Sequence, residues 1–192
     1  MRNITAFVFS QCVGISVTVF AYKYADFKDW RWREFYENIT VDLDAFLDKY
    51  VAEGRTMNVG TDSKIRGKYT FFATAIIAHR TNTGGSVIIN KAKVPTYPSL
   101  RQKLLMEAMR TLETAWYLAA RLSDDVRIRL HVDVNNELKW QSGQYKEELV
   151  GMIMGQGFVS YKDVIGDPDN YPRLVYWKPA SWAASSVADL RT

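Results

Sequence analysis

The sequence predicts an α/β protein with a mixed β-sheet flanked by α-helices, and three observations favour that class. Stretches rich in β-branched and aromatic residues, which are typical of strands, occur beside stretches with helical periodicity. The first three strands are joined by short turns, as in an antiparallel meander. Helices separate the later strands, as in crossover connections between parallel strands. The first strand of the meander is therefore expected at the centre of the sheet.

The first half of the chain is expected to form one helix and three strands. Apolar residues recur at helical spacing over 41–53, and Gly54 ends that helix. Residues 56–62, 68–80 and 86–94 have strand composition. The segments "SKIRG" and "TNTGG" between them are interpreted as turns, so the three strands should form two hairpins.

The second half is expected to alternate between helices and strands. Ser99 is a suitable cap for a long helix that runs to about residue 122, because leucine and alanine recur there at helical spacing. Residues 126–134 alternate between apolar and polar side chains, as in a strand with one buried face. A helix is expected over 143–154. Two short strands and a closing amphipathic helix complete the chain.

Length and composition indicate one domain. The 192 residues are 47% hydrophobic, which is enough for one substantial core. The net charge of +4 and pI near 9.1 fit a polyanionic partner without requiring one. The single cysteine, Cys12, excludes an intrachain disulfide, and so few Cys and His residues argue against structural zinc. We expect an N-terminal extension over 1–40 and a domain over 41–192.

The extension contains an uncharged segment, residues 4–22, with about the length of a membrane span. Polar residues interrupt it, and part of it alternates with the period of a strand. We expect a strand, a hairpin or a loosely packed extension, and therefore a cytoplasmic protein. A membrane anchor formed by this segment, or a cleaved signal peptide, is the alternative.

Four acidic residues occupy positions that suggest more than a solvated surface. Asp62 ends an apolar strand between small residues, and Asp133 ends the alternating strand. Glu107 lies at the margin of the buried stripe of the long helix, and Asp189 lies in the closing helix. Each has an ordinary alternative, such as a turn aspartate or an exposed carboxylate paired with a neighbouring Lys or Arg.

Considered together, the four acids predict a metal site. If the first and fourth strands are neighbours, Asp62 and Asp133 project side by side. Carboxylates that converge without nearby cations repel each other, and divalent metal relieves that repulsion. A set of oxygen ligands favours Mg²⁺ or Mn²⁺ over zinc.

Short motifs in the same regions resemble a known family. The segments "VGTDSK", "HVDVN", "EELVGMIMGQGF" and "WKPASWAASSVADLRT" are similar to YkuK-type ribonuclease H-like proteins, and the resemblance covers about residues 55–192. It implies a ribonuclease H-like fold. It also implies that Asp62, Glu107, Asp133 and Asp189 are catalytic metal ligands.

A carboxylate cluster of this kind predicts a nuclease that cleaves phosphodiester bonds with two Mg²⁺ or Mn²⁺ ions about 4 Å apart. His131 is then a candidate to relay a proton or orient a phosphate, unless it only fills a polar niche in the sheet. Lys64, Arg66 and Lys68 are candidates to contact a nucleic-acid backbone, with a solvated turn as the alternative. Lys178 is a further candidate. The substrate stays open between RNA, DNA and hybrid, and the competing hypothesis is a catalytically idle nucleic-acid-binding or scaffold protein.

Overall fold

The structure, a computed structural model, describes residues 27–80, 84–132, 141–160, 165–167 and 171–176. The helices and strands within these ranges are, in chain order, η1 (Phe27–Asp29), β1 (Trp32–Glu34), β2 (Thr40–Val41), α1 (Leu43–Ala52), β3 (Thr56–Arg66), β4 (Tyr69–Arg80), β5 (Gly84–Pro95), α2 (Leu100–Arg121), β6 (Ile128–His131), η2 (Gln141–Tyr145), α3 (Lys146–Met154), β7 (Val159–Ser160) and β8 (Arg173–Tyr176). The helices and strands predicted within these ranges are present. The closing helix and the end of the fourth strand lie outside them.

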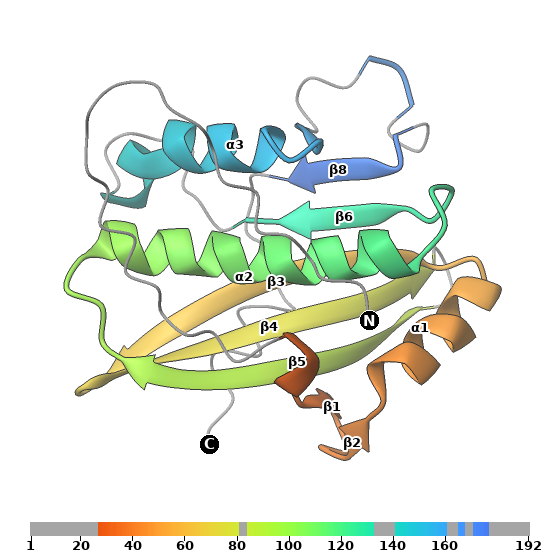
Figure 1. The fold of residues 1–192 in the computed structure, drawn as a ribbon, viewed down its shortest axis with the longest axis horizontal. Helices are drawn as coiled ribbons and strands as arrows, with labels where there is room; N and C mark the ends of the chain where they lie inside the picture. Colours follow the sequence, from red (N-terminus) through yellow and green to blue (C-terminus); the bar gives the residue numbers. More distant parts are fainter. Residues whose placement is uncertain (1–26, 81–83, 133–140, 161–164, 168–170, 177–192) are drawn as a thin grey trace, which may run out of the picture.

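The described strands form one eight-stranded mixed sheet in the order β2-β1-β5-β4-β3-β6-β8-β7. Helix α2 lies across one face of this sheet (Figure 1). Strands β3, β4 and β5 are antiparallel neighbours, whereas β3, β6 and β8 run parallel. Strand β3 thus joins the antiparallel meander to the parallel strands. Both the α/β class and the predicted central place of the first strand are confirmed.

Strand β3 is longer than the sequence pattern suggested. It continues beyond Asp62 to Arg66, and Lys64 and Arg66 pair directly with Phe71 and Tyr69 on β4. The prediction that Asp62 ends the strand and that "SKIRG" forms a turn was therefore wrong. The polar residues are tolerated in the strand because this end of the hairpin is exposed. The turn itself lies at Gly67, whose φ of 59° favours glycine.

The segment before α1, which was assigned to the N-terminal extension, contains a strand of the main sheet. Its residues 32–34 form β1, which pairs antiparallel with β5 and places Trp32 opposite Asn90. Trp32 is almost fully buried, because its indole packs into the main core. Residues 32–34 and the strands after residue 41 therefore belong to one sheet. The domain boundary at residue 40 stays a prediction.

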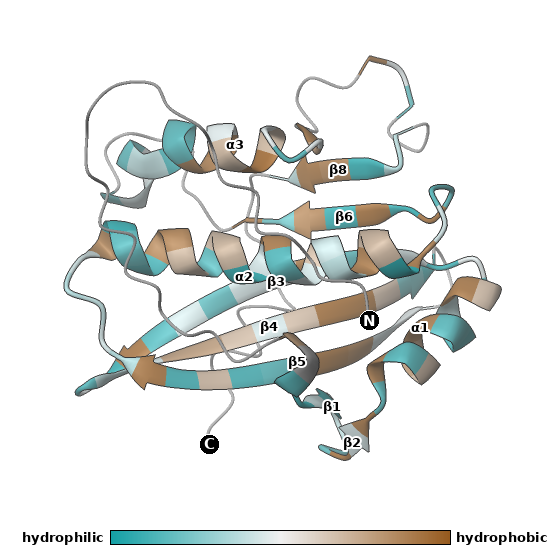
Figure 2. Cartoon of the chain, viewed as in Figure 1, coloured by the Kyte–Doolittle hydropathy of each residue, from teal (hydrophilic) through white to brown (hydrophobic). Residues whose placement is uncertain are grey.

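The main core lies between α2 and the sheet. Ser99 caps α2 as predicted, since its Oγ accepts a hydrogen bond from the amide of Gln102 at 3.2 Å. Hydrophobic and hydrophilic residues alternate along the helix (Figure 2). The core-facing apolar side chains of α2 are Leu104, Ala108, Leu112, Ala115 and Leu118.

A second, polar set of α2 side chains is also buried against the sheet. Glu107, Arg110, Thr111 and Thr114 are all buried. Arg110 donates hydrogen bonds to Asn90 Oδ1 on β5 at 2.7 Å and to Thr74 Oγ1 on β4 at 3.3 Å. Its guanidinium also lies 4.0 Å from the centre of the Trp30 ring. We call Lys103, Glu107, Arg110 and Thr114, which recur every three or four residues, the polar seam of α2.

Among the helices of the described ranges, none is long and apolar enough to cross a membrane. The segment 4–22, for which an anchor was considered, lies outside those ranges.

Leu112 tests the packing of α2. Replacing this fully buried leucine by alanine leaves a cavity under the helix, so we expect the free energy of unfolding to fall by about 2–5 kcal/mol. Urea denaturation monitored by circular dichroism measures the change. Trp116→Ala is the matched control, because Trp116 lies one turn later and is 40% exposed. Equal losses in the two variants would contradict the assignment of the buried face.

Candidate functional site

The candidate site lies where the parallel strands end. Strand β6 ends at His131, which is in register with Gly60 on β3 and with Tyr176 at the end of β8. Asp62 lies two residues beyond Gly60, on the part of β3 that continues past β6. The carboxyl ends of parallel strands commonly form the ligand site of α/β sheets. Asp62 therefore lies at the end of the parallel pairing, although not at the end of its own strand.

Glu107 is a buried carboxylate between α2 and β3. Its side chain is 8% exposed, and its Oε1 accepts hydrogen bonds from Ser63 Oγ and from Lys103 Nζ, both at 2.6 Å. Burial raises the pKa of Glu107. Lys103 and the Ser63 hydroxyl act in the opposite direction, and the charge of Asp62 adds to the increase. The net result is a pKa above the ordinary glutamate value.

Asp62 and Glu107 lie on different sides of strand β3. Asp62 pairs with Ala73, which belongs to the small apolar cluster of β4 and β5, whereas the next residue, Ser63, contacts Glu107 below α2. Because consecutive strand residues point to opposite faces, Asp62 emerges on the face away from α2. Its Oδ1 accepts a hydrogen bond from the Ser63 amide at 2.7 Å. Strand β3 therefore lies between the faces that carry the two acids, and the charge of Asp62 makes only the smallest contribution to the raised pKa of Glu107.

Lys103 corrects the expectation that the acids converge without a nearby cation. Its ammonium lies 2.6 Å from Glu107 Oε1 and 3.0 Å from Ser63 Oγ. The spacing of four residues on α2 also fits an ordinary exposed ion pair, which was the alternative to a metal ligand at Glu107. In the structure the side chains of Lys103 and Glu107 are only 17% and 8% exposed, so this pair is largely buried. Lys103 is thus a site residue that the sequence interpretation did not include.

His131 is held in a defined orientation. Its Nε2 donates to Asn58 Oδ1 at 3.0 Å, and its ring stacks on Tyr176 with centroids 5.2 Å apart and an interplanar angle of 10°. Burial, reinforced by the charge of Arg129, lowers the pKa of His131 to about 4. The imidazole is therefore neutral at pH 7, with Nδ1 as its proton-acceptor nitrogen. These contacts fit a histidine in a polar niche, and a proton-relay role stays a prediction.

Three of the predicted site residues are not among those that the structure describes. Asp133, Asp189 and Lys178 lie outside the described ranges. Within those ranges, no three His, Cys, Asp or Glu side chains are close enough together to hold a metal ion. The described part contributes two oxygen donors, from Asp62 and Glu107, to the predicted ligand set. This donor chemistry fits Mg²⁺ or Mn²⁺.

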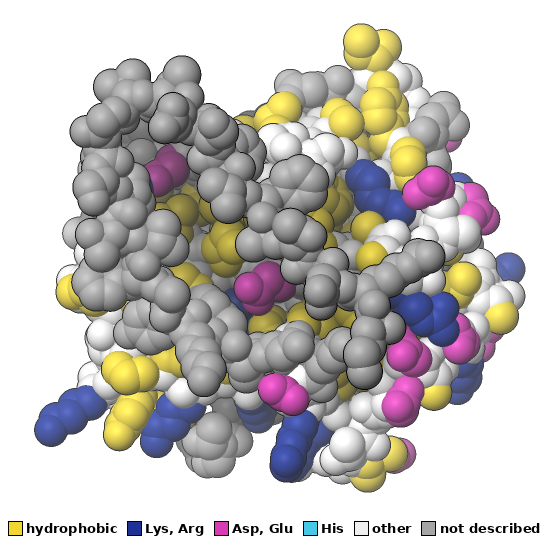
Figure 3. Space-filling model, in the orientation of Figure 1, with side chains coloured by type: hydrophobic (Ala, Val, Ile, Leu, Met, Phe, Trp, Pro, Cys, Tyr) yellow, Lys and Arg dark blue, Asp and Glu magenta, His cyan; other side chains and the backbone are white. Residues whose placement is uncertain are grey.

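The predicted nucleic-acid contacts lie next to the site. Lys64, Arg66 and Lys68 are exposed, and Lys64 and Arg66 share the Asp62 face of β3. Figure 3 shows Lys and Arg side chains projecting around this end of the meander, at the lower left of the view. Lys64 and Arg66 belong to the strand instead of the predicted turn, so their spacing and direction are set by the sheet.

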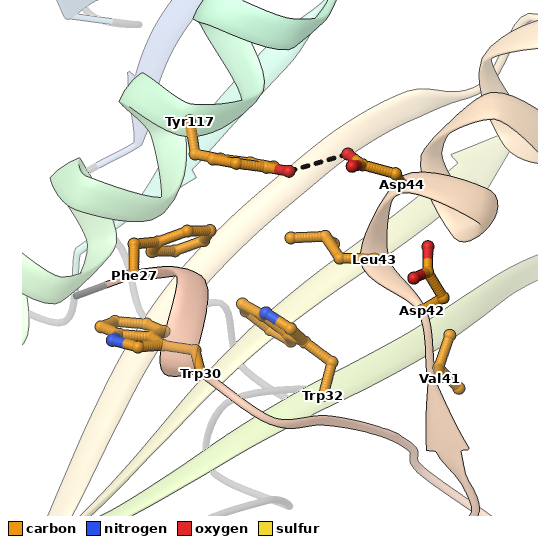
Figure 4. A pocket seen from close by; sticks show the side chains of 8 residues that line it. All are labelled: Phe27, Trp30, Trp32, Val41, Asp42, Leu43, Asp44 and Tyr117. Atoms are coloured by element: carbon orange, nitrogen blue, oxygen red, sulfur yellow. Dashed lines mark hydrogen bonds between the residues drawn. The ribbon is translucent and has the colours of Figure 1, made fainter. Parts of the chain in front are cut away.

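A cavity of about 390 Å³ lies away from the acids, between η1, β1, the start of α1 and the last third of α2 (Figure 4). The aromatic rings of Phe27, Trp30, Trp32 and Tyr117 contribute to its lining. The Tyr117 hydroxyl donates to Asp44 at 2.7 Å, whereas the buried Trp32 Nε1 has no hydrogen-bond partner in the described ranges. Tyr117 lies ten residues after Glu107, which is about 15 Å along a helix. The cavity is therefore separate from the carboxylate site.

Comparison with known proteins gives one family and one relative. Residues 38–192 match the family model described as "Ribonuclease H-like". A protein of Bacillus subtilis (strain 168), "Uncharacterized protein YkuK", is 26% identical over 156 residues, an alignment that covers 73% of this chain and 87% of the relative. No solved structure matches the chain.

The lowered pKa of His131 predicts a loss of stability in acid. The unfolded chain binds this proton near pH 6.5 and the folded chain only near pH 4. His131 therefore contributes stability above about pH 6.5, and that contribution falls by about 3 kcal/mol as the pH decreases to 4.

The measurement compares the parent protein with His131→Gln by urea denaturation in EDTA between pH 7.5 and 4. We expect the stability of the parent, relative to the variant, to fall over this range. Parallel pH profiles would contradict the neutral, buried state of His131.

Proposed function

The chain belongs to the ribonuclease H-like family, and on this premise we propose that it is a metal-dependent nuclease that hydrolyses phosphodiester bonds. The observation that carries the proposal is the buried carboxylate of Glu107, which α2 holds against Ser63, the residue that follows Asp62 on β3. Burial raises the pKa of Glu107 although Lys103 and Ser63 act in the opposite direction, and a bound divalent cation would stabilise its charged form. Perturbed carboxylates of this kind cluster at functional sites.

We propose Asp62, Glu107, Asp133 and Asp189 as the ligands of Mg²⁺ or Mn²⁺. In such sites the bound ions lower the pKa of the attacking water and stabilise the leaving oxygen. Ser63 and Lys103 hold the carboxylate of Glu107 in one orientation.

The other polar residues of the site have positioning roles in this proposal. The neutral His131, with Nε2 committed to Asn58, presents Nδ1 as an acceptor for a proton or for a hydroxyl donor. Lys64, Arg66, Lys68 and Lys178 contact the phosphates of an RNA, DNA or hybrid substrate. Phosphate contacts of this kind position a nucleic acid without selecting its sequence.

One observation favours a second candidate function, a catalytically idle nucleic-acid-binding protein. The ammonium of Lys103 already compensates the charge of Glu107 from a distance of 2.6 Å. In an idle protein this ion pair takes the place of a metal ion. The two candidates therefore differ in whether Mg²⁺ interacts with the site.

Substitution of the acids tests the nuclease. Asp62→Asn and Asp133→Asn should each abolish Mg²⁺- or Mn²⁺-dependent cleavage, measured on a panel of hybrid, duplex, single-stranded and branched substrates. Their metal-free stability should stay equal to that of the parent or rise, because charge repulsion is relieved. Asp124→Asn is the control, since Asp124 is fully exposed after α2. Variants of Asp62 and Asp133 that cleave as well as the parent would overturn the ligand assignment.

Lys103→Met separates the two candidates. Without the ammonium, Glu107 is left buried with no cation, so we expect the metal-free free energy of unfolding to fall by about 3 kcal/mol. For a nuclease, Mg²⁺ should restore part of this stability in a thermal melting experiment. If Mg²⁺ leaves the melting temperatures of both the parent and Lys103→Met unchanged, while nucleic acid still binds in EDTA, the idle protein is the correct interpretation.

A further inference from the structure

The outer end of the meander carries a group of cations and aromatic rings on one face. Strand pairing places Lys64 opposite Phe71, and Phe71 opposite Lys93. Arg66 lies opposite Tyr69 in the same way. Directly paired residues share a face of a sheet, so these side chains from three strands project together.

Their contacts confirm the shared face. The ammonium of Lys93 lies 4.0 Å from the centre of the Tyr69 ring and 5.6 Å from that of Phe71. The guanidinium of Arg66 lies 5.8 Å from the centre of the Phe71 ring. Tyr69 is 43% exposed, and the neighbouring cations are exposed as well. The Tyr69 ring is therefore accessible to a ligand. An anionic ligand that binds Lys93 would leave this ring free for stacking.

The charged residues around these rings are almost all basic. Between residues 56 and 95 the sequence contains one acid, Asp62, and six basic residues: Lys64, Arg66, Lys68, Arg80, Lys91 and Lys93. Five of the six lie at the outer end of the meander. Within the described part of the chain, no carboxylate forms an ion pair with Arg66, Lys91 or Lys93. Charge complementarity therefore points to a polyanion.

The same face leads to the candidate site. Asp62 pairs with Ala73, and Ala73 pairs with Lys91, one step along the strands from Lys64, Phe71 and Lys93. From Arg66 to Asp62 is four strand residues, about 13 Å. A strand of nucleic acid bound along this face therefore reaches Asp62 without crossing to the α2 side.

We propose that Tyr69, Phe71, Lys64, Arg66, Lys91 and Lys93 form a binding platform for single-stranded nucleic acid, which we call the meander platform. The inference deepens the proposed function and rests on its assignment of nucleic acid as the substrate. The cations bind phosphates, and the exposed ring of Tyr69 stacks on a base. A duplex hides its base faces, so the aromatic component favours a single strand.

Fluorescence anisotropy with a labelled oligothymidylate in EDTA tests the platform, using the full-length chain. The double substitution Lys91→Gln and Lys93→Gln should reduce the slope of log affinity against log salt by about 1.4, because each single-strand phosphate contact contributes about 0.7. Tyr69→Ala should weaken binding roughly 5- to 150-fold. Phe71 is left unchanged because it is less exposed than Tyr69.

Lys49→Gln is the matched control. The ammonium of Lys49 lies 4.8 Å from the centre of the Tyr50 ring on α1. The substitution therefore removes an equivalent cation–aromatic contact outside the meander platform. Binding by this variant should equal that of the parent. Circular dichroism and thermal melting of all variants verify that the exposed substitutions leave the fold intact.

The outcomes separate the platform from the nuclease. Unchanged affinity and salt slope in both platform variants, or a duplex that binds the parent as tightly as the single strand, would overturn the platform while leaving cleavage by Asp62 untouched. A parent that never cleaves, but binds single strands in EDTA and loses that binding in the platform variants, would support the platform and reject the nuclease.

Discussion

The fold depends on the desolvation of the polar seam of α2. Lys103, Glu107, Arg110 and Thr114 leave water when the helix packs on the sheet, and each then needs a partner. Glu107 finds Ser63 on β3, and Arg110 finds Thr74 and Asn90 on β4 and β5. Apolar contacts alone would tolerate a small sliding of the helix. These hydrogen bonds restrict α2 to one position over three strands, and that position places Glu107 against Ser63.

Much of the architecture could be predicted because its periodicities are strong. The meander, the long helix and the parallel strand after it each follow a clear pattern. Strand β1 was missed since three residues are too few to show alternation, and its place is decided by pairing with β5. The extension of β3 beyond Asp62 was missed for a related reason. Its polar residues have the composition of a turn, while their strand geometry comes from the partner β4.

The site was harder to predict than the fold, since burial does not follow from spacing. Lys103 and Glu107 have the same four-residue separation as many exposed ion pairs, and only the packing of α2 distinguishes them. The meander platform joins residues up to 29 positions apart through strand register. A signal was nevertheless present: Lys91 and Lys93, and Tyr69 and Phe71, recur with a period of two in a region that has no acid after Asp62.

The cations at the outer end of the meander have one more consequence. Lys64 and Arg66 are exposed on the same face of β3. Like charges repel, so two copies of the chain that met at this face would be driven apart. The same cations thereby favour a dispersed protein at low ionic strength, and concentrated salt weakens that protection.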